Sequence, residues 1–225
     1  MNKTMFDADA LIQMFQNATA KQGEQLKQAA GQATLAALQG RELTLKNIRG
    51  ALQSVADAAS QGAARNVTAG IDPGALLDKA VAGMDEALLK AVEANRTALS
   101  SLMAQGADMR DKHLQKALSD LEKLEDNTLA AMKKAAAGAG APMLGAWEQV
   151  LQKLQAGGTL SGAQAASTAE QMATQMQTAM RSSRAASMKA AQALTESYTA
   201  MVSGVLIGMS EALRSGGANK QGGRK

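Results

Sequence analysis

Few residues in this sequence could do chemistry, and none is spaced for it. His113 is the single histidine of the 225-residue chain, and it stands beside Asp111 and Lys112 on a charged stretch. One histidine and no cysteine exclude His-rich zinc sites and Cys–His nucleophile pairs. The many serines and threonines have no evident base. We therefore expect a protein that is not an enzyme and that binds no metal and no cofactor.

The acidic residues and the glycine-rich segment also indicate structural roles rather than catalysis or nucleotide binding. Two carboxylate groups sit among lysines at helical spacing, which predicts ion pairs on a helix surface rather than acid–base couples. These groups are Asp85 with Glu86, and Glu122 with Glu125 and Asp126. The segment GAGAP, residues 138–142, lacks the Lys-Ser/Thr of a P-loop and the spacing of a dinucleotide-binding loop. We interpret it as a joint between helices.

The composition predicts helices with little to bury. Hydrophobic residues make up 46% of the chain and aromatic residues only 2%, with 14 methionines. Much of the apolar share is alanine, which is the best helix former but buries little area. This favours an all-α fold, an elongated helical bundle or coiled coil. Because an alanine seam stabilises a single subunit only weakly, we expect a homo-oligomer.

Charge and hydropathy limit the compartment and the partners. The net charge of +4 is too balanced for a committed nucleic-acid binder. Asp7 and Asp9 stand where a secretory signal needs an apolar run, and the most apolar stretch, 198–209, is too short to cross a bilayer. We therefore expect a soluble cytoplasmic protein without a transmembrane segment. The basic C-terminal third leaves binding to the nucleoid or an anionic membrane as the least favoured alternative.

Capping residues and glycines predict about six helices. Asp72 followed by Pro73 is the clearest start signal, because Asp caps a helix and Pro suits its first position. Trp147, on a short helix, is the best candidate for an anchor to the rest of the chain. The expected helices run from Asp7 or Asp9 to Gln39, from Thr44 to about Asn66, from Asp72 to about Gln105, from Asp108 or Asp111 to about Ala137, from Pro142 to Leu154, and, as one very long C-terminal helix, from Ser161 to Leu213.

These helices group into four parts along the chain. Short loops favour antiparallel neighbours, and a tail without large apolar residues favours disorder. The expected parts are an N-terminal helical hairpin (1–70), a central helical hairpin (71–141), a short connector helix with the long Met/Ala-rich helix (142–215), and a disordered polar tail (216–225).

Two helices carry regular apolar seams. The spacing of 4 and 3 residues between Leu77 and Leu102 is typical of a left-handed coiled coil, and we expect it to form an oligomer seam. Asn95 is polar within this seam, where Asn usually fixes register and oligomer state; a role in recognition is the alternative. In the preceding helix the seam ends in small residues, so its partner must approach most closely near Gly62. The predicted oligomer seam consists of Leu77, Val81, Met84, Leu88, Asn95 and Leu102.

A methionine stripe is the best candidate for a binding surface. Methionine is flexible and polarisable and adapts to irregular apolar surfaces. The stripe could fill a bundle core between small residues, or it could meet lipid, polymer or an interchangeable partner helix. The residues of this predicted surface are Met172, Met176, Met180, Met188 and Met201.

The chain resembles a known family in composition. Stretches such as AALQGRELTLKNIRGALQSVADAASQGAARN (36–66) and MDEALLKAVEANRTALSSL (84–102) are Ala-rich, Cys-free and almost without aromatic residues. They resemble phasins, helical proteins associated with polyhydroxyalkanoate granules, and a related uncharacterised Ala-rich proteobacterial family. The resemblance covers most of residues 7–215. It implies a non-catalytic, self-associating amphipathic coat on a hydrophobic polymer or lipid surface, located in the cytoplasm at the granule surface. The alternative is a structural or scaffold coiled-coil protein that self-assembles or binds partner helices.

Overall fold

The computed structural model describes residues 7–66, 70–105, 112–182, 198, 200–207 and 209. Within these ranges the chain is helical and contains no strand, which confirms the all-α fold. A further helical segment covers residues 200–207. The elements are α1 (Ala8–Gln16), η1 (Ala20–Gln22), α2 (Gly23–Leu38), α3 (Leu45–Ala64), α4 (Pro73–Ala104), α5 (Lys112–Glu122), α6 (Leu124–Gly138), η2 (Ala141–Met143), α7 (Leu144–Gly157) and α8 (Leu160–Ser182).

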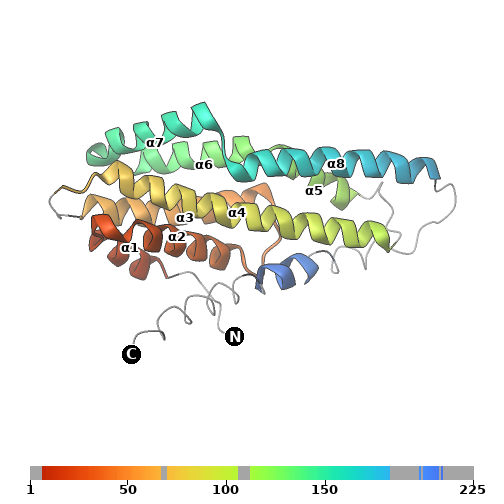
Figure 1. Ribbon diagram of the computed structural model, residues 1–225, viewed down its shortest axis with the longest axis horizontal. Helices are drawn as coiled ribbons and strands as arrows, with labels where there is room; N and C mark the ends of the chain where they lie inside the picture. Colours follow the sequence, from red (N-terminus) through yellow and green to blue (C-terminus); the bar gives the residue numbers. More distant parts are fainter. Residues whose placement is uncertain are drawn as a thin grey trace.

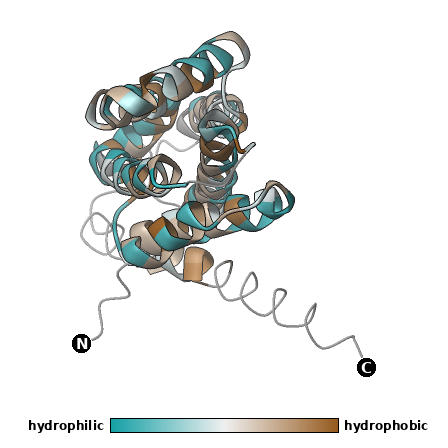
Figure 2. Cartoon of the chain, turned by 90° about the vertical axis from the view of Figure 1, so that its left-hand side faces the viewer, coloured by the Kyte–Doolittle hydropathy of each residue, from teal (hydrophilic) through white to brown (hydrophobic). Residues whose placement is uncertain are grey.

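The helices form an elongated bundle of three layers (Figure 1). α1 and α2 lie on one side, α3 and α4 in the middle, and α5 to α8 on the other side. α4 is the long central helix, and it contacts α2, α3, α7 and α8. Viewed from the end of the bundle, the helices carry both hydrophilic and hydrophobic residues (Figure 2), as amphipathic helices around a shared core must.

The predicted helix starts are confirmed where a capping side chain is present. Asp7, Thr44 and Asp72 each accept a hydrogen bond from a backbone N–H two or three residues further on. Each of these bonds satisfies a donor that has no partner within the helix. Pro73 occupies the first turn of α4, and α4 ends at Ala104, one residue before the predicted end.

The number of helices differs from the expected six, because two expected helices are each divided. In the first, Thr19 and Gln22 form a capping box that begins a new helix after a turn at Asn17 and Ala18. In the other, the division at Lys123 is slight: its N–H still bonds to the carbonyl of Ser119, but its backbone departs from helical values, with φ −94° and ψ 4°. Up to Ser182 the described residues therefore form eight α-helices.

Glycines let the first two layers touch backbone to backbone. A Cβ at Gly62 of α3 would lie 2.5 Å from the carbonyl oxygen of Ile12 and from Cβ of Phe15, both in α1. The close approach predicted at Gly62 is therefore confirmed. A Cβ at Gly83 of α4 would overlap the carbonyl of Lys27, and one at Gly31 of α2 would lie 3.0 Å from the carbonyl of Gly83. α2 and α4 accordingly form the most extensive helix pair of the bundle.

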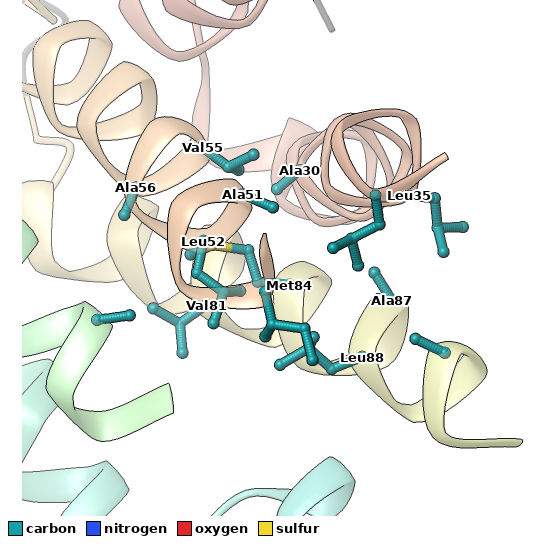
Figure 3. Close-up of a cluster of buried hydrophobic side chains, with 14 of the residues drawn as sticks. Ala30, Leu35, Ala51, Leu52, Val55, Ala56, Val81, Met84, Ala87 and Leu88 are labelled. Atoms are coloured by element: carbon teal, nitrogen blue, oxygen red, sulfur yellow. The ribbon is translucent and has the colours of Figure 1, made fainter. Parts of the chain in front are cut away.

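One continuous core runs through all the layers. Figure 3 shows part of this core, in which Leu35 of α2, Leu52 of α3 and Met84 of α4 belong to one cluster. The six predicted seam residues are all buried within the single chain, none more than 8% exposed. The predicted oligomer seam is therefore corrected to an intramolecular one, since the partner helices belong to the same chain. The seam residues are Leu77, Val81, Met84, Leu88, Asn95 and Leu102.

The predicted very long C-terminal helix is described only in part. Its first portion is α8, and residues 200–207 are helical as well. Residues 183–197, which would have to join the two, lie outside the described part, as does the polar tail 216–225. None of the described helices combines the length and hydrophobicity needed to cross a bilayer.

Candidate functional site

The methionine stripe faces inward where the structure describes it. Met172 is only 2% exposed and belongs to the core, so its assignment to an open binding surface is corrected. Met176 and Met201 are partly buried and pack against the same core. The side chain of Met180 and the whole of Met188 lie outside the described part. The stripe is thus part of a helix interface.

The described surface presents no open apolar face in its place. Among the described residues, the exposed large hydrophobic side chains are Met14, Leu144 and Leu160. They lie on three different helices, α1, α7 and α8. Within the described part of the chain, most large apolar side chains are therefore covered.

The inner face of α8 is made mainly of small residues. It contacts α4, α5 and α6. Ala165, Ala169 and Met172 are buried, as is Thr168 between them. Each Ala in place of Leu lacks three carbon atoms, or about 0.8 kcal/mol of burial per CH₂ group. The hydroxyl of Thr168 has no hydrogen-bond partner among the described residues, which weakens the contact further.

Polar contacts hold the first turn of α8 instead. Asp85 of α4 accepts from the backbone N–H groups of Leu160 and Ser161, both at 2.9 Å. Glu125 of α6 accepts from the Thr159 N–H at 3.0 Å and from its hydroxyl. The Thr159 hydroxyl oxygen in turn accepts from the N–H of Gly162 at 2.9 Å. Negative charge beside a helix N-terminus is also favoured by the helix dipole.

The glycines around this turn make the close contact geometrically feasible. Gly158 has a φ of 68°, which side-chain-bearing residues rarely adopt. A Cβ at Gly162 would overlap a carboxylate oxygen of Glu125. We call this arrangement of Asp85, Glu125 and Thr159 the carboxylate latch. Sequence reasoning placed Asp85 and Glu125 in surface ion pairs, and the structure corrects both.

A second polar contact lies on the second half of α4. The hydroxyl of Tyr198 donates to Oδ1 of Asn95 at 2.6 Å. Burial raises the pKa of the Tyr198 phenol well above its usual value, and the charges of Asp120 and Glu42 raise it further. Asn95 also borders a small apolar cavity between α3, α4 and α5. Asn95 therefore acts as a polar contact within the chain.

Trp147 is the predicted anchor, and the structure confirms it. Its indole is 1% exposed, and Nε1 donates to the hydroxyl of Ser60 in α3 at 3.0 Å. The side chain of His113 lies outside the described part. Within the described ranges, no three histidine or acidic side chains gather as a metal site.

Comparison with known protein families gives a match over most of the chain. A family model described as "Family of unknown function (DUF6781)" matches residues 1–215. No curated protein and no solved structure matches the chain.

Proposed function

The chain belongs to the DUF6781 family, and from its structure we propose that it is a non-catalytic protein that binds hydrophobic surfaces when α8 lifts off the bundle. The observation that carries the proposal is the inner face of the third layer. On that face α8, which carries the buried Met172, packs against α5, which carries three buried leucines, and a polar latch holds the first turn of α8. Those leucines are Leu114, Leu118 and Leu121.

The third layer is the part of the bundle best suited to open. α1 with α3, and α2 with α4, approach each other through glycines, so their separation would break many close contacts. α5 makes most of its helix contacts with α8. Lifting α8 therefore exposes the apolar faces of two amphipathic helices while the other layers remain packed. A soft, methionine-bearing face adapts to an irregular surface such as polymer or lipid.

An engineered disulfide tests whether opening is required. A Cβ at position 162 would point at the side chain of Glu125, 2.6 Å from its Cδ, so cysteines at positions 125 and 162 would face each other, and a disulfide between them would hold α8 to α6. The chain has no cysteine of its own, so only these two thiols can pair. We expect the oxidised variant to bind triolein droplets and polyhydroxybutyrate particles several-fold more weakly than the reduced variant.

The control for this test is Glu125→Cys alone, treated with the same oxidant. Its binding to droplets should not change on oxidation. Equal binding by the oxidised and reduced double variant would contradict opening. If neither form binds droplets or particles and the protein instead forms a stable assembly, the scaffold alternative is the better account.

Self-association and location belong to the same proposal. Because the α4 seam is buried within one chain, copies would associate through the faces that opening exposes. We expect the mass measured by light scattering to rise when the double variant is reduced. A fluorescently tagged chain should be cytoplasmic and gather on granules in cells that store polymer. An evenly spread tag in such cells would argue against a granule role.

A further inference from the structure

We propose that the carboxylate latch sets how often α8 opens while the rest of the bundle stays folded. The latch deepens the proposed function, because it names the contact that regulates release of the apolar face. Its opening can nevertheless be measured without any hydrophobic ligand. A failure of the latch is therefore distinguishable from a failure of surface binding.

The latch connects α8 to two other helices through charge-assisted hydrogen bonds. Asp85 bonds two consecutive N–H groups of α8 and reaches them from α4, 75 and 76 residues away in sequence. Glu125 reaches Thr159 from α6. Thr159 and Ser161 are 7% and 0% exposed, so water does not readily replace their partners, whereas Leu160 is exposed. Removing one side would leave buried backbone donors without an acceptor.

The remainder of α8 offers little to compensate for a lost latch. Its buried positions after the first turn are Ala165, Thr168, Ala169 and Met172, and only Met172 is large. Beyond Met172, Thr174 and Gln175 are exposed and Met176 is partly buried. The apolar contact is therefore concentrated in about two turns. A helix attached in this way opens locally at a lower free energy than the core helices.

Hydrogen exchange of the full-length chain tests the latch. Asp85→Asn replaces the carboxylate on α4 by an amide, which keeps one uncharged acceptor oxygen. Glu125→Gln makes the same change on α6. We expect α8 amides between residues 165 and 176 to exchange roughly 10- to 100-fold faster in each variant, the factor for losing charge-assisted hydrogen bonds. Exchange in α2 should be unchanged.

Two matched controls remove a carboxylate from α4 outside the latch. Asp78→Asn breaks the ion pair with the exposed Lys153 of α7, and Glu93→Gln breaks the pair with Arg96 within α4. Neither should change exchange in α8. Unchanged α8 exchange in both latch variants would overturn the proposal. Equal acceleration in α2 and α8 would also overturn it, because the carboxylates would then stabilise the whole bundle.

Measuring both α8 exchange and droplet binding in Asp85→Asn tests the latch and the surface-binding function independently. If α8 exchanges faster in Asp85→Asn and droplet binding also increases, both are supported. If α8 exchanges faster and droplet binding stays absent, the latch stands and the surface-binding function is rejected.

Discussion

Ser60 and Trp147 form a buried side-chain hydrogen bond between distant parts of the chain. Ser60 also donates to the carbonyl of Ala56, so its hydroxyl links the indole to the α3 backbone. Ser60→Ala would leave the indole N–H without its acceptor, and we expect the free energy of unfolding to fall by about 1–3 kcal/mol. Urea denaturation followed by circular dichroism measures this.

The chain offers a matched control for the Ser60 prediction. Ser54 donates to the carbonyl of Gly50 in the same geometry, but it lies on the exposed side of α3. Ser54→Ala should change the free energy of unfolding by no more than about 0.5 kcal/mol. Equal effects of the two substitutions would mean that the Trp147 bond adds nothing.

Tyr198 should make stability depend on alkaline pH. Because its pKa is raised in the folded chain, the unfolded phenol loses its proton first, from about pH 10. Below that pH both states keep the proton, so the contribution is fully present. Above it, the free energy of unfolding should fall by up to about 1.4 kcal/mol per pH unit.

Denaturation of the wild type and of Tyr198→Phe across this pH range isolates the Tyr198 effect. Lysines titrate in the same range, and the variant retains all of them. Tyr198 is the single tyrosine, so tyrosinate absorbance follows its ionisation directly. Identical pH profiles for the two proteins would contradict the burial of the phenol.

At the scale of whole elements, the contact of α2 with α4 depends on glycine. Gly83→Ala would place a methyl group against the Lys27 carbonyl, a backbone atom that cannot move without shifting α2. We expect a loss of about 2–3 kcal/mol in the free energy of unfolding, measured by thermal or urea denaturation.

Gly50→Ala is the control for the α2–α4 contact. Gly50 is also helical, but a Cβ there would meet nothing within 4 Å. Since Ala favours helices over Gly, this change should stabilise the protein by about 0.5–1 kcal/mol. A stabilising effect of Gly83→Ala as well would show that the two helices do not touch there.

The sequence predicts these elements well where a local signal exists. Asp72–Pro73 and Thr44 mark helix starts through bonds to N–H groups two or three residues away. The turn before Thr19 interrupts a stretch whose apolar pattern continues, and only the Thr19–Gln22 pair announces it. The break at Lys123 has no such marker, because the helical hydrogen bonds continue across it.

For the whole molecule, a single core joins the ranges expected as separate hairpins. α2, from residues 1–70, covers α4, from residues 71–141. We therefore expect fragments 1–70 and 71–225 each to be poorly folded and to recover helicity when mixed. Circular dichroism of the two fragments, alone and combined, measures this. A fragment 71–225 that unfolds alone with the cooperativity of the full chain would contradict it.

The apolar seam of α4 shows that a sequence pattern predicts which residues are buried but not which helices cover them. The 4 and 3 spacing in α4 correctly predicts that Leu77 and Leu102 are covered by helices. It does not reveal whether the covering helices belong to the same chain, since the apolar spacing is the same in both cases. The latch could not be predicted, because Asp85 and Ser161 are brought together only by the tertiary fold.

Because Met172 is buried, its oxidation would show that α8 has opened. Peroxide converts an accessible methionine to its sulfoxide, a polar group that the core would not readily take back. Met14, which is 43% exposed, is open to oxidation at all times, whereas Met172 can be reached only while its helix is away from the bundle. Mass spectrometry of the protein isolated from cells would give the fraction of sulfoxide at Met172 relative to that at Met14. This ratio would report how often α8 leaves the bundle inside the cell.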